Sequence, residues 1–362
     1  MIYLDYNAST PILLEAQQAM IEAFSFLGNP SSIHSHGRAT RKILENAREQ
    51  VARYFNLPAR NVTFTSGATE DNNFILKGFK GQILTSTVEH DSALKACSNA
   101  IRIPVDNQGV LNLESLKELL KVTPKKSLVC VLAVNNETGV IQPIIEILQI
   151  CKKYNAHLHV DAAQAVGKIQ LDWKSLPSFT VSAHKFGGPK GIGAIVINNK
   201  INLTSLIEGG GQERGLRAGT ENIIGAVGMG AAFGFNFETL RPLQARLENG
   251  ILNVCPQAVI FGKDGPRIAN TTAITMPNVR SEVQLMHFDL NSISISSGSA
   301  CSSGKVKSSH VLHAMGVPEK IAKCAVRIST GWTTTEADID KCIEVWTDLF
   351  NSQNLKQKRG IT

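Results

Sequence analysis

A lysine stands between a predicted strand and a glycine-rich turn. Lys185 follows Ser182-Ala183-His184 and precedes residues 187–191, GGPKG. A lysine held close to a sheet loses hydration, which lowers the pKa of its amine and makes it available as a Schiff-base nucleophile. A solvated surface charge is the alternative interpretation, and these residues alone leave both open.

A cysteine lies in a loop made of small residues. Cys301 lies in residues 296–304, and all the remaining residues of this segment are Ser, Gly or Ala. At an ordinary pKa of about 8.5, roughly 3% of such a thiol is thiolate at neutral pH, so a base or a positive charge must activate it. Lys305 and Lys307 are close enough in sequence to contribute. The alternative is an inert surface cysteine.

Two more polar groups follow predicted strands. Residues 66–70, SGATE, place small residues where backbone N–H groups can approach an anion at a helix N-terminus. An ordinary strand-to-helix turn with Thr69 as the N-cap is the alternative. Residues 159–164, HVDAAQ, place Asp161 where it can pair with a protonated ring nitrogen or a metal, or cap a helix. His157 and His159 share the strand face of Asp161, but core histidines are commoner and no third ligand is evident, so we expect no metal site.

The elements around these groups alternate between strand and helix. Helical spacing is clear at 37–55, and helices are also expected from about residue 69 and at 91–100, 113–121 and 144–154. Strands are expected at 62–65, 83–87, 128–134, 157–160, 179–183 and 194–197. This order predicts an α/β fold with a mainly parallel sheet, in which 194–197 is a candidate antiparallel strand, and ligands bind at the carboxyl ends of the strands.

After about Phe237 the pattern changes to a smaller α+β unit. A helix is expected at 240–253, strands at 269–276 and 292–297, and a final helix that opens with a Thr333-x-x-Glu336 capping box. We therefore expect a large domain over 15–238. Residues 1–14 and 239–362 would form a small domain that carries the Cys301 loop.

Composition bounds the class of protein. The 362 residues are 43% hydrophobic with a net charge of +7. The basic residues do not form the stripe that is typical of proteins that bind nucleic acid directly. The longest apolar run, 223–235, is shorter than the ~20 residues that span a bilayer, and the first residues do not resemble a signal peptide. Seven widely spaced cysteines without a CxxC pair suit a reducing cytoplasm rather than a disulfide framework.

The motifs, taken in order, resemble the cysteine desulfurases of the class V aminotransferase family, in the group that includes the NifS and IscS proteins. The matching segments cover nearly the whole chain: 4–8 (LDYNA), 28–32 (GNPSS) with His34, 65–70 (TSGATE), 88–90 (VEH), 134–139 (VNNETG), 160–164 (VDAAQ), 182–185 (SAHK), 209–214 (GGGQER), 217–220 (RAGT), 297–301 (SGSAC) and 326–329 (VRIS). The resemblance implies a pyridoxal 5′-phosphate (PLP) enzyme of fold type I, with a mainly parallel seven-stranded sheet and a smaller α+β domain.

The resemblance also implies a role for each matching residue. Lys185 would hold PLP covalently and shuttle the α-proton, Asp161 would pair with the pyridine nitrogen, and His90 would stack on the ring and serve in acid–base transfer. Gln164 would bond the phenolic oxygen, and Asn136 would lie against the cofactor and, with Arg327, bind the substrate carboxylate. The phosphate would be held by Ala68, Thr69, Ser182 and His184, with Thr220 reaching the phosphate of the partner subunit in a homodimer.

The implied reaction converts L-cysteine to L-alanine and leaves the sulfur on Cys301 as a persulfide. The sulfur would pass to an acceptor, such as an iron–sulfur scaffold or a carrier for tRNA thiolation or cofactor synthesis. Two alternatives remain: another class V enzyme, such as an aminotransferase or selenocysteine lyase, and a non-catalytic sulfur-carrier or regulatory protein. Residues 304–307, GKVK, replace the family's common Leu-Glu-Pro stretch, and the tail 351–362 is short and basic, so acceptor docking stays open.

Overall fold

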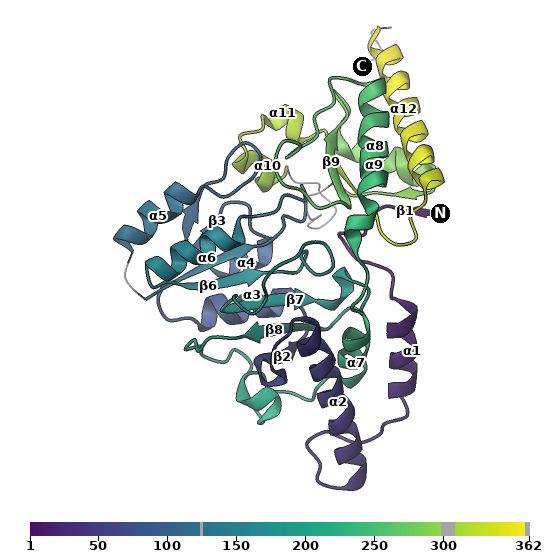
Figure 1. Ribbon diagram of the computed structural model, residues 1–362. Helices are drawn as coiled ribbons and strands as arrows, with labels where there is room; N and C mark the ends of the chain where they lie inside the picture. The colour runs from purple at the N-terminus through teal and green to yellow at the C-terminus, as the bar shows by residue number, and fades with distance from the viewer. Residues whose placement is uncertain (124–125, 298–307, 359–362) are drawn as a thin grey trace.

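The computed structural model describes residues 1–123, 126–297 and 308–358, and within them seven strands form one sheet (Figure 1). The strand order is β2-β8-β7-β6-β5-β3-β4. The strands are β2 (Val62–Thr65), β3 (Gln82–Ser86), β4 (Ile101–Ile103), β5 (Ser127–Leu132), β6 (His157–Asp161), β7 (Ser178–Ser182) and β8 (Gly193–Ile197). β8 runs antiparallel to both β2 and β7, and the other neighbouring pairs are parallel. The predicted mainly parallel seven-stranded sheet and its antiparallel strand are confirmed.

Helices cover both faces of this sheet, which explains why its strands are apolar without alternation. In β5 every residue is buried. Val129 and Val131 join one hydrophobic cluster, while Leu128 and Cys130 join the cluster on the other face. The first cluster takes in α2 (Ser35–Tyr54), α5 (Leu113–Val122), α6 (Ile144–Lys153) and α7 (Ile223–Ala231), and the second takes in α3 (Ala68–Gly78) and α4 (Asp91–Ala96). Helix α1 (Leu14–Ala23) packs on α7.

A separate hydrophobic cluster joins the first residues to the C-terminal part of the chain. Leu4 packs with Ile274, Val326 and Trp346, all of them buried. The elements of this part are β1 (Ile2–Tyr3), α8 (Arg241–Val254), β9 (Thr271–Thr275), α9 (Ser281–Leu290), β10 (Ile293–Ser294), α10 (His310–Ala314), α11 (Glu319–Ala322), β11 (Ala325–Ser329) and α12 (Glu336–Lys358). β1 pairs with β10, and β9 pairs antiparallel with β11. The domain boundaries 15–238, 1–14 and 239–362 stay a prediction.

Three local expectations are corrected. The capping box of α12 is formed by Thr335 and Asp338 instead of Thr333 and Glu336, because the Thr333 hydroxyl is bound to Tyr6. Thr335 Oγ1 accepts the backbone N–H of Asp338 at 3.2 Å, and Asp338 Oδ2 accepts the backbone N–H of Thr335 at 2.8 Å. Helix α4 ends at Ala96 instead of residue 100, since Cys97 leaves the helical conformation. The predicted strand 292–297 is shortened to β10, followed by a single bridge from Ser296 to Arg327.

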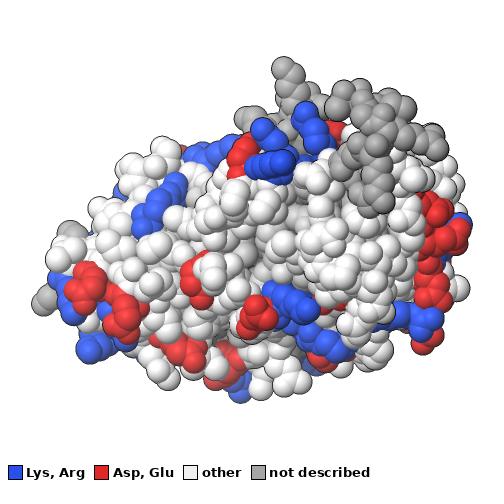
Figure 2. Space-filling model, turned by 90° about the horizontal axis from the view of Figure 1, so that it is seen from above, with Lys and Arg blue, Asp and Glu red and all other residues white. Residues whose placement is uncertain are grey.

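Charged side chains of both signs are interspersed over the face seen in Figure 2, in keeping with the short-range ion pairs along the helices. The ion pair between Arg48 and Glu213 differs from these because both of its side chains are buried. Arg48 binds Glu213 through two bonds, Nη1 to Oε2 at 2.6 Å and Nη2 to Oε1 at 2.9 Å. Glu213 also accepts the backbone N–H of Phe64 at 3.0 Å, so it fixes α2 to strand β2. Within the described residues, no helix is both long and apolar enough to cross a bilayer.

We predict that Glu213→Gln lowers the free energy of unfolding by about 3 kcal/mol, because it removes the buried carboxylate and leaves the Arg48 guanidinium with only the partly exposed Glu45 as counter-charge. Urea denaturation would measure this change. The control is Asp340→Asn, which breaks an ion pair with Arg246 that lies at the surface and should change the midpoint little. Equal losses in the two variants would contradict the prediction.

Candidate active site

A cavity of about 1040 Å³ lies at the carboxyl ends of β2, β3, β5, β6 and β7. Residues of the C-terminal part, including Ser296, Ser308 and Arg327, complete its wall. Most of the predicted site residues line it: Ala68, Thr69, His90, Asn136, Asp161, Gln164, Ser182, His184, Lys185 and Arg327. Thr220 is exposed and is not in this wall. Cys301 lies outside the described residues.

Lys185 presents its amine to the cavity from a short turn directly after β7. Its Nζ donates to the backbone oxygens of Asn7 at 2.7 Å and Ala8 at 2.9 Å. Loss of hydration, together with the positive charge of Arg327, lowers the pKa of Lys185 to about 8. The interpretation as an amine with enhanced nucleophilicity is therefore favoured over a solvated surface charge.

Asp161 ends strand β6 with both carboxylate oxygens bound. Oδ1 accepts the backbone N–H of Ala163 at 3.0 Å, and Oδ2 accepts the side-chain amide of Asn72 at 2.7 Å. Asn72 is fully buried on α3 and also donates to the Ser92 hydroxyl at 2.9 Å. The carboxylate is thus fixed in the cavity wall, where it can face a protonated ring nitrogen.

His90 is connected to Asp161 through the same residues. Its Nδ1 accepts the backbone N–H of Ser92 at 3.1 Å and lies 2.8 Å from the Ser92 hydroxyl. Because Nδ1 is an acceptor, the neutral ring carries its proton on Nε2. Loss of hydration lowers the pKa of His90, so the neutral form is favoured. Asn72 and Ser92 were not predicted from the sequence, since isolated Asn and Ser residues in helices give no pattern.

Residues at the start of α3 line the cavity. Gly67 is the N-cap residue with a φ of 142°, and no side chain caps the helix, so the prediction of Thr69 as N-cap is wrong. Gly193 lies against this turn: a Cβ there would come within 2.6 Å of the Gly67 Cα. Ser182 and His184 face the same region. Burial lowers the pKa of His184 to about 4, so the ring is neutral.

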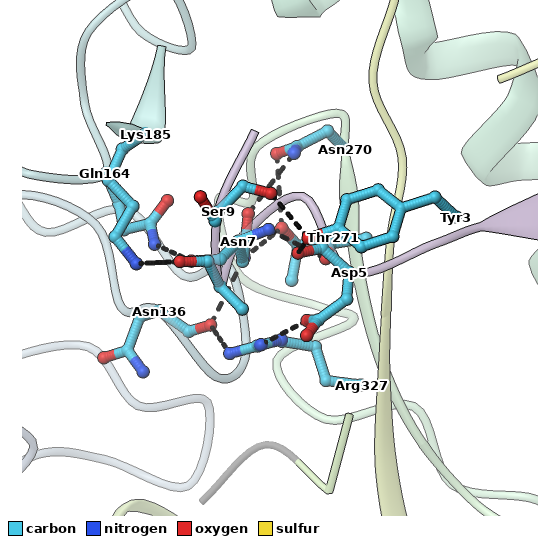
Figure 3. A network of polar contacts seen from close by, with 12 residues as sticks. Tyr3, Asp5, Asn7, Ser9, Asn136, Gln164, Lys185, Asn270, Thr271 and Arg327 are labelled. Atoms are coloured by element: carbon cyan, nitrogen blue, oxygen red, sulfur yellow. Dashed lines mark hydrogen bonds and ion pairs between the residues drawn. The ribbon is translucent and has the colours of Figure 1, made fainter. Parts of the chain in front are cut away.

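Arg327 extends from β11 into the cavity wall. Its Nη2 binds Asp5 Oδ1 at 2.7 Å, and its Nη1 donates to the backbone oxygen of Asn136 at 2.9 Å. Its Nε is buried without a partner among the described residues. In Figure 3 the side-chain amide of Asn136 points away from this contact. The guanidinium therefore retains donor capacity for an anionic ligand.

Asn7 connects these groups, although no local sequence pattern predicts a role for it. Its backbone oxygen accepts both Lys185 Nζ and Gln164 Nε2, the latter at 2.9 Å (Figure 3). Its side-chain nitrogen donates to the backbone oxygen of Asn136 at 3.2 Å and to the hydroxyl of Thr271 at 2.8 Å. The N-terminal segment is thus built into the site. The role of this segment becomes visible only from its contacts with C-terminal residues that are distant in sequence.

Two flanks of the cavity hold the residues that follow the Cys301 loop. The Ser309 hydroxyl donates to buried Glu137, and His310 Nε2 lies 2.9 Å from the backbone oxygen of Glu89.

Elsewhere, His159 is fully buried with ring nitrogens 2.9 Å from Ser178 Oγ and 3.1 Å from Thr180 Oγ1. Burial lowers the pKa of His159 to about 3. His159 is therefore a core histidine whose two nitrogens are already used.

The aminotransferase class-V family model matches residues 2–342. A cysteine desulfurase of Sinorhizobium fredii is 39% identical, and the match covers 95% of each chain. The cysteine desulfurase IscS of Clostridium botulinum is 37% identical over all of this chain and 96% of its own. The NifS-like protein of Rickettsia africae has the same fold, with a TM-score of 0.89 and 38% identity over 97% of this chain and 99% of its own.

We predict that acylation of Lys185 by a small reagent, in protein freed of any carbonyl compound bound to this amine, is half-maximal near pH 8, because its pKa is lowered to about 8. Peptide mass spectrometry across a pH series would measure this. Exposed lysines are the internal control, since a hydrated amine titrates at about 10.4. Arg327→Met should move the midpoint upward, because it removes a positive charge that disfavours the ammonium form. A Lys185 curve that coincides with those of exposed lysines would refute the assignment.

Proposed function

The chain belongs to the aminotransferase class-V family, and from this premise we propose how its own residues carry out the reaction of a PLP-dependent cysteine desulfurase. The enzyme converts L-cysteine to L-alanine and transfers the sulfur to an enzyme cysteine. The observation that carries the assignment of roles is the placement of the Lys185 amine, with its lowered pKa, in one cavity with Asp161, His90 and Arg327.

The cavity residues fit PLP at each of its polar positions. Lys185 would attach to the aldehyde carbon, and Asp161 would face the ring nitrogen. The phosphate would lie at the uncapped start of α3, held by Ala68 and Thr69 with Ser182 and His184. When bound, the cofactor supplies a conjugated ring that withdraws electrons from the substrate α-carbon. The absence of a side-chain cap on α3 supports this placement, because its first N–H groups are left for a ligand.

The proton transfers follow from the bonding of these residues. Asp161, held by Asn72, would stabilise a proton on the ring nitrogen of the cofactor. Lys185 Nζ, with a pKa of about 8, can accept the α-proton of the substrate as a free amine near neutral pH. His90, whose neutral ring carries its proton on Nε2, would lie against the cofactor ring and serve in acid–base transfer. Arg327 and Asn136 would bind and orient the substrate carboxylate.

Cys301 would complete the reaction as the nucleophile. Its thiolate would attack the substrate sulfur, and the carbon–sulfur bond would break with its electron pair left on the carbon side. That carbon would take up a proton, so that alanine leaves while the persulfide stays on Cys301. The described flanks Ser296 and Ser308 both line the cavity, which supports this role. Burial raises the pKa of every cysteine in the described part of the chain, which makes those thiols poor nucleophiles: Cys97, Cys130, Cys151, Cys255, Cys324 and Cys342.

A homodimer is the proposed functional unit. Large apolar side chains are exposed on α1 and on the turn after it: Leu14, Ile21, Phe24, Leu27 and Ile33. A second copy of the chain would cover this surface. Thr220, which is exposed and does not line the cavity of its own subunit, would reach the cavity of that second copy. The sulfur would then pass to an acceptor protein, either an iron–sulfur scaffold or a carrier for tRNA thiolation or cofactor synthesis. A cytoplasmic location agrees with the buried free cysteines.

We predict that Cys301→Ala loses alanine formation from L-cysteine by on the order of 10³-fold or more, because no other thiol can take the sulfur. The purified protein would be incubated with L-cysteine, alanine measured, and the extra sulfur located by peptide mass on the peptide that contains residue 301. Lys185→Ala should lose both alanine formation and the visible absorbance of bound PLP. Full turnover in Cys301→Ala would favour another class V activity. Absorbance that survives in Lys185→Ala would refute the lysine's role.

We predict that the wild-type protein sediments as a dimer and that Phe24→Glu with Leu27→Glu gives a monomer that retains PLP poorly. Charges in the proposed interface would lose the hydration that the free surface gives them. Leu290→Glu on α9 is the matched control, since Leu290 is also a strongly exposed apolar side chain but lies outside the proposed surface. A dimer that persists in the double variant, or dissociates in the control, would contradict this interface.

A further inference from the structure

The turn after β6 contains a buried lysine that the proposed mechanism does not use. Lys168 is 4% exposed and follows Gln164 by four residues. The charged groups that act most strongly on it are the cations Lys185 and Arg327, and it is in no ion pair of the described residues. A buried amine is costly unless each donor has a partner. Its partners therefore indicate what it is there to do.

Lys168 has three partners, as many as an ammonium group has donors. Its Nζ donates to Asn7 Oδ1 at 3.0 Å and to Gln164 Oε1, and it lies 5.2 Å from the centre of the Phe237 ring. Burial and the nearby cations Lys185 and Arg327 lower the pKa of Lys168, but both the ammonium and the neutral amine have at least two N–H donors for the two amide oxygens. The Gln164 amide is therefore held at both ends, since its Nε2 donates to the backbone oxygen of Asn7 and its Oε1 accepts from Lys168.

This orientation places the Gln164 nitrogen beside the amine of Lys185. Gln164 Nε2 and Lys185 Nζ both donate to the backbone oxygen of Asn7, at 2.9 and 2.7 Å, and converge there in Figure 3. One N–H of the Gln164 amide is used in this contact, and the second is available to a ligand. Gln164 lines the cavity, so this N–H is a donor next to the atom that would carry the cofactor.

We propose that Lys168 is a positioning residue that fixes the amide of Gln164, so that a hydrogen-bond donor faces the phenolic oxygen of PLP. The proposal rests on the proposed contact between Gln164 and that oxygen. A donor to the phenolic oxygen draws off its negative charge and weakens its hold on the proton of the nitrogen that joins PLP to Lys185. Without Lys168 the Gln164 amide keeps only its bond to the backbone oxygen of Asn7, so the N–H that faces the phenolic oxygen is held less firmly in place.

The test follows the visible absorbance of the PLP-loaded protein against pH, together with the dissociation constant of PLP in the absence of L-cysteine. Lys168→Met should raise the apparent pKa of the absorbance change by about one unit. It should also weaken PLP binding about five- to tenfold, as expected for the loss of one hydrogen bond. Lys174→Met is the matched control, because Lys174 is exposed on a loop away from the cavity. It should leave both values unchanged.

A double-variant cycle separates action through Gln164 from a direct effect of the lysine charge. Gln164→Ala alone should reproduce both shifts, and Lys168→Met added to it should change nothing further. Wild-type values in Lys168→Met, or shifts that add in the double variant, would overturn the proposal. Lys168→Gln keeps one donor and should give a smaller shift of the same sign; it replaces Lys168→Met if that variant does not fold. A wild-type protein without PLP absorbance would instead refute the proposed function.

Discussion

The site depends on removing amines and guanidinium groups from water while providing few counter-charges. Lys185, Lys168 and Arg327 lie around the N-terminal segment, where Asp5 binds Arg327 and backbone or amide oxygens satisfy the two lysines. The pKa of Lys185 falls because its hydration is lost and Arg327 is near. Carbonyl oxygens satisfy the donors without restoring the full stability of the ammonium form that a carboxylate partner would give. The nucleophilicity of the amine is therefore a property of the whole arrangement.

The sheet provides the geometry for this arrangement. Parallel strands end at one edge, so the polar turns after β2, β3, β6 and β7 meet although the first and last of them are more than a hundred residues apart in sequence. The C-terminal part adds Arg327 from the opposite side, and Asn7 bonds to residues of both parts. Asp161 ends β6 and His90 is the N-cap residue of α4, and the side chains of Asn72 and Ser92 join them. A ring held between Asp161 and His90 would have its position set from two sides.

Sequence patterns predicted the sheet and the groups at its edge because both have local signals. Apolar strand runs followed by small polar turns are readable, and Lys185, Asp161 and the 66–70 turn follow such runs. Asn72, Ser92 and Lys168 have no local signal, since their roles arise from contacts across the fold. The cap of α12 moved by two residues because Tyr6, more than three hundred residues away, binds the Thr333 hydroxyl. The uncapped start of α3 is likewise visible only when the side chains are placed.

The pairing of the first strand with late segments has a consequence for biosynthesis. Leu4 bonds to Ser294 and Ser329, and Asn7 contacts Thr271 and Ser329. During translation the seven-stranded sheet can form before residues 2–9 have their partners, because the C-terminal strands have not yet left the ribosome. Asn7 cannot settle against the Lys185 amine until then. In a nascent chain the proposed coenzyme site is therefore incomplete, and the coenzyme can bind there only after the ribosome has synthesised β11.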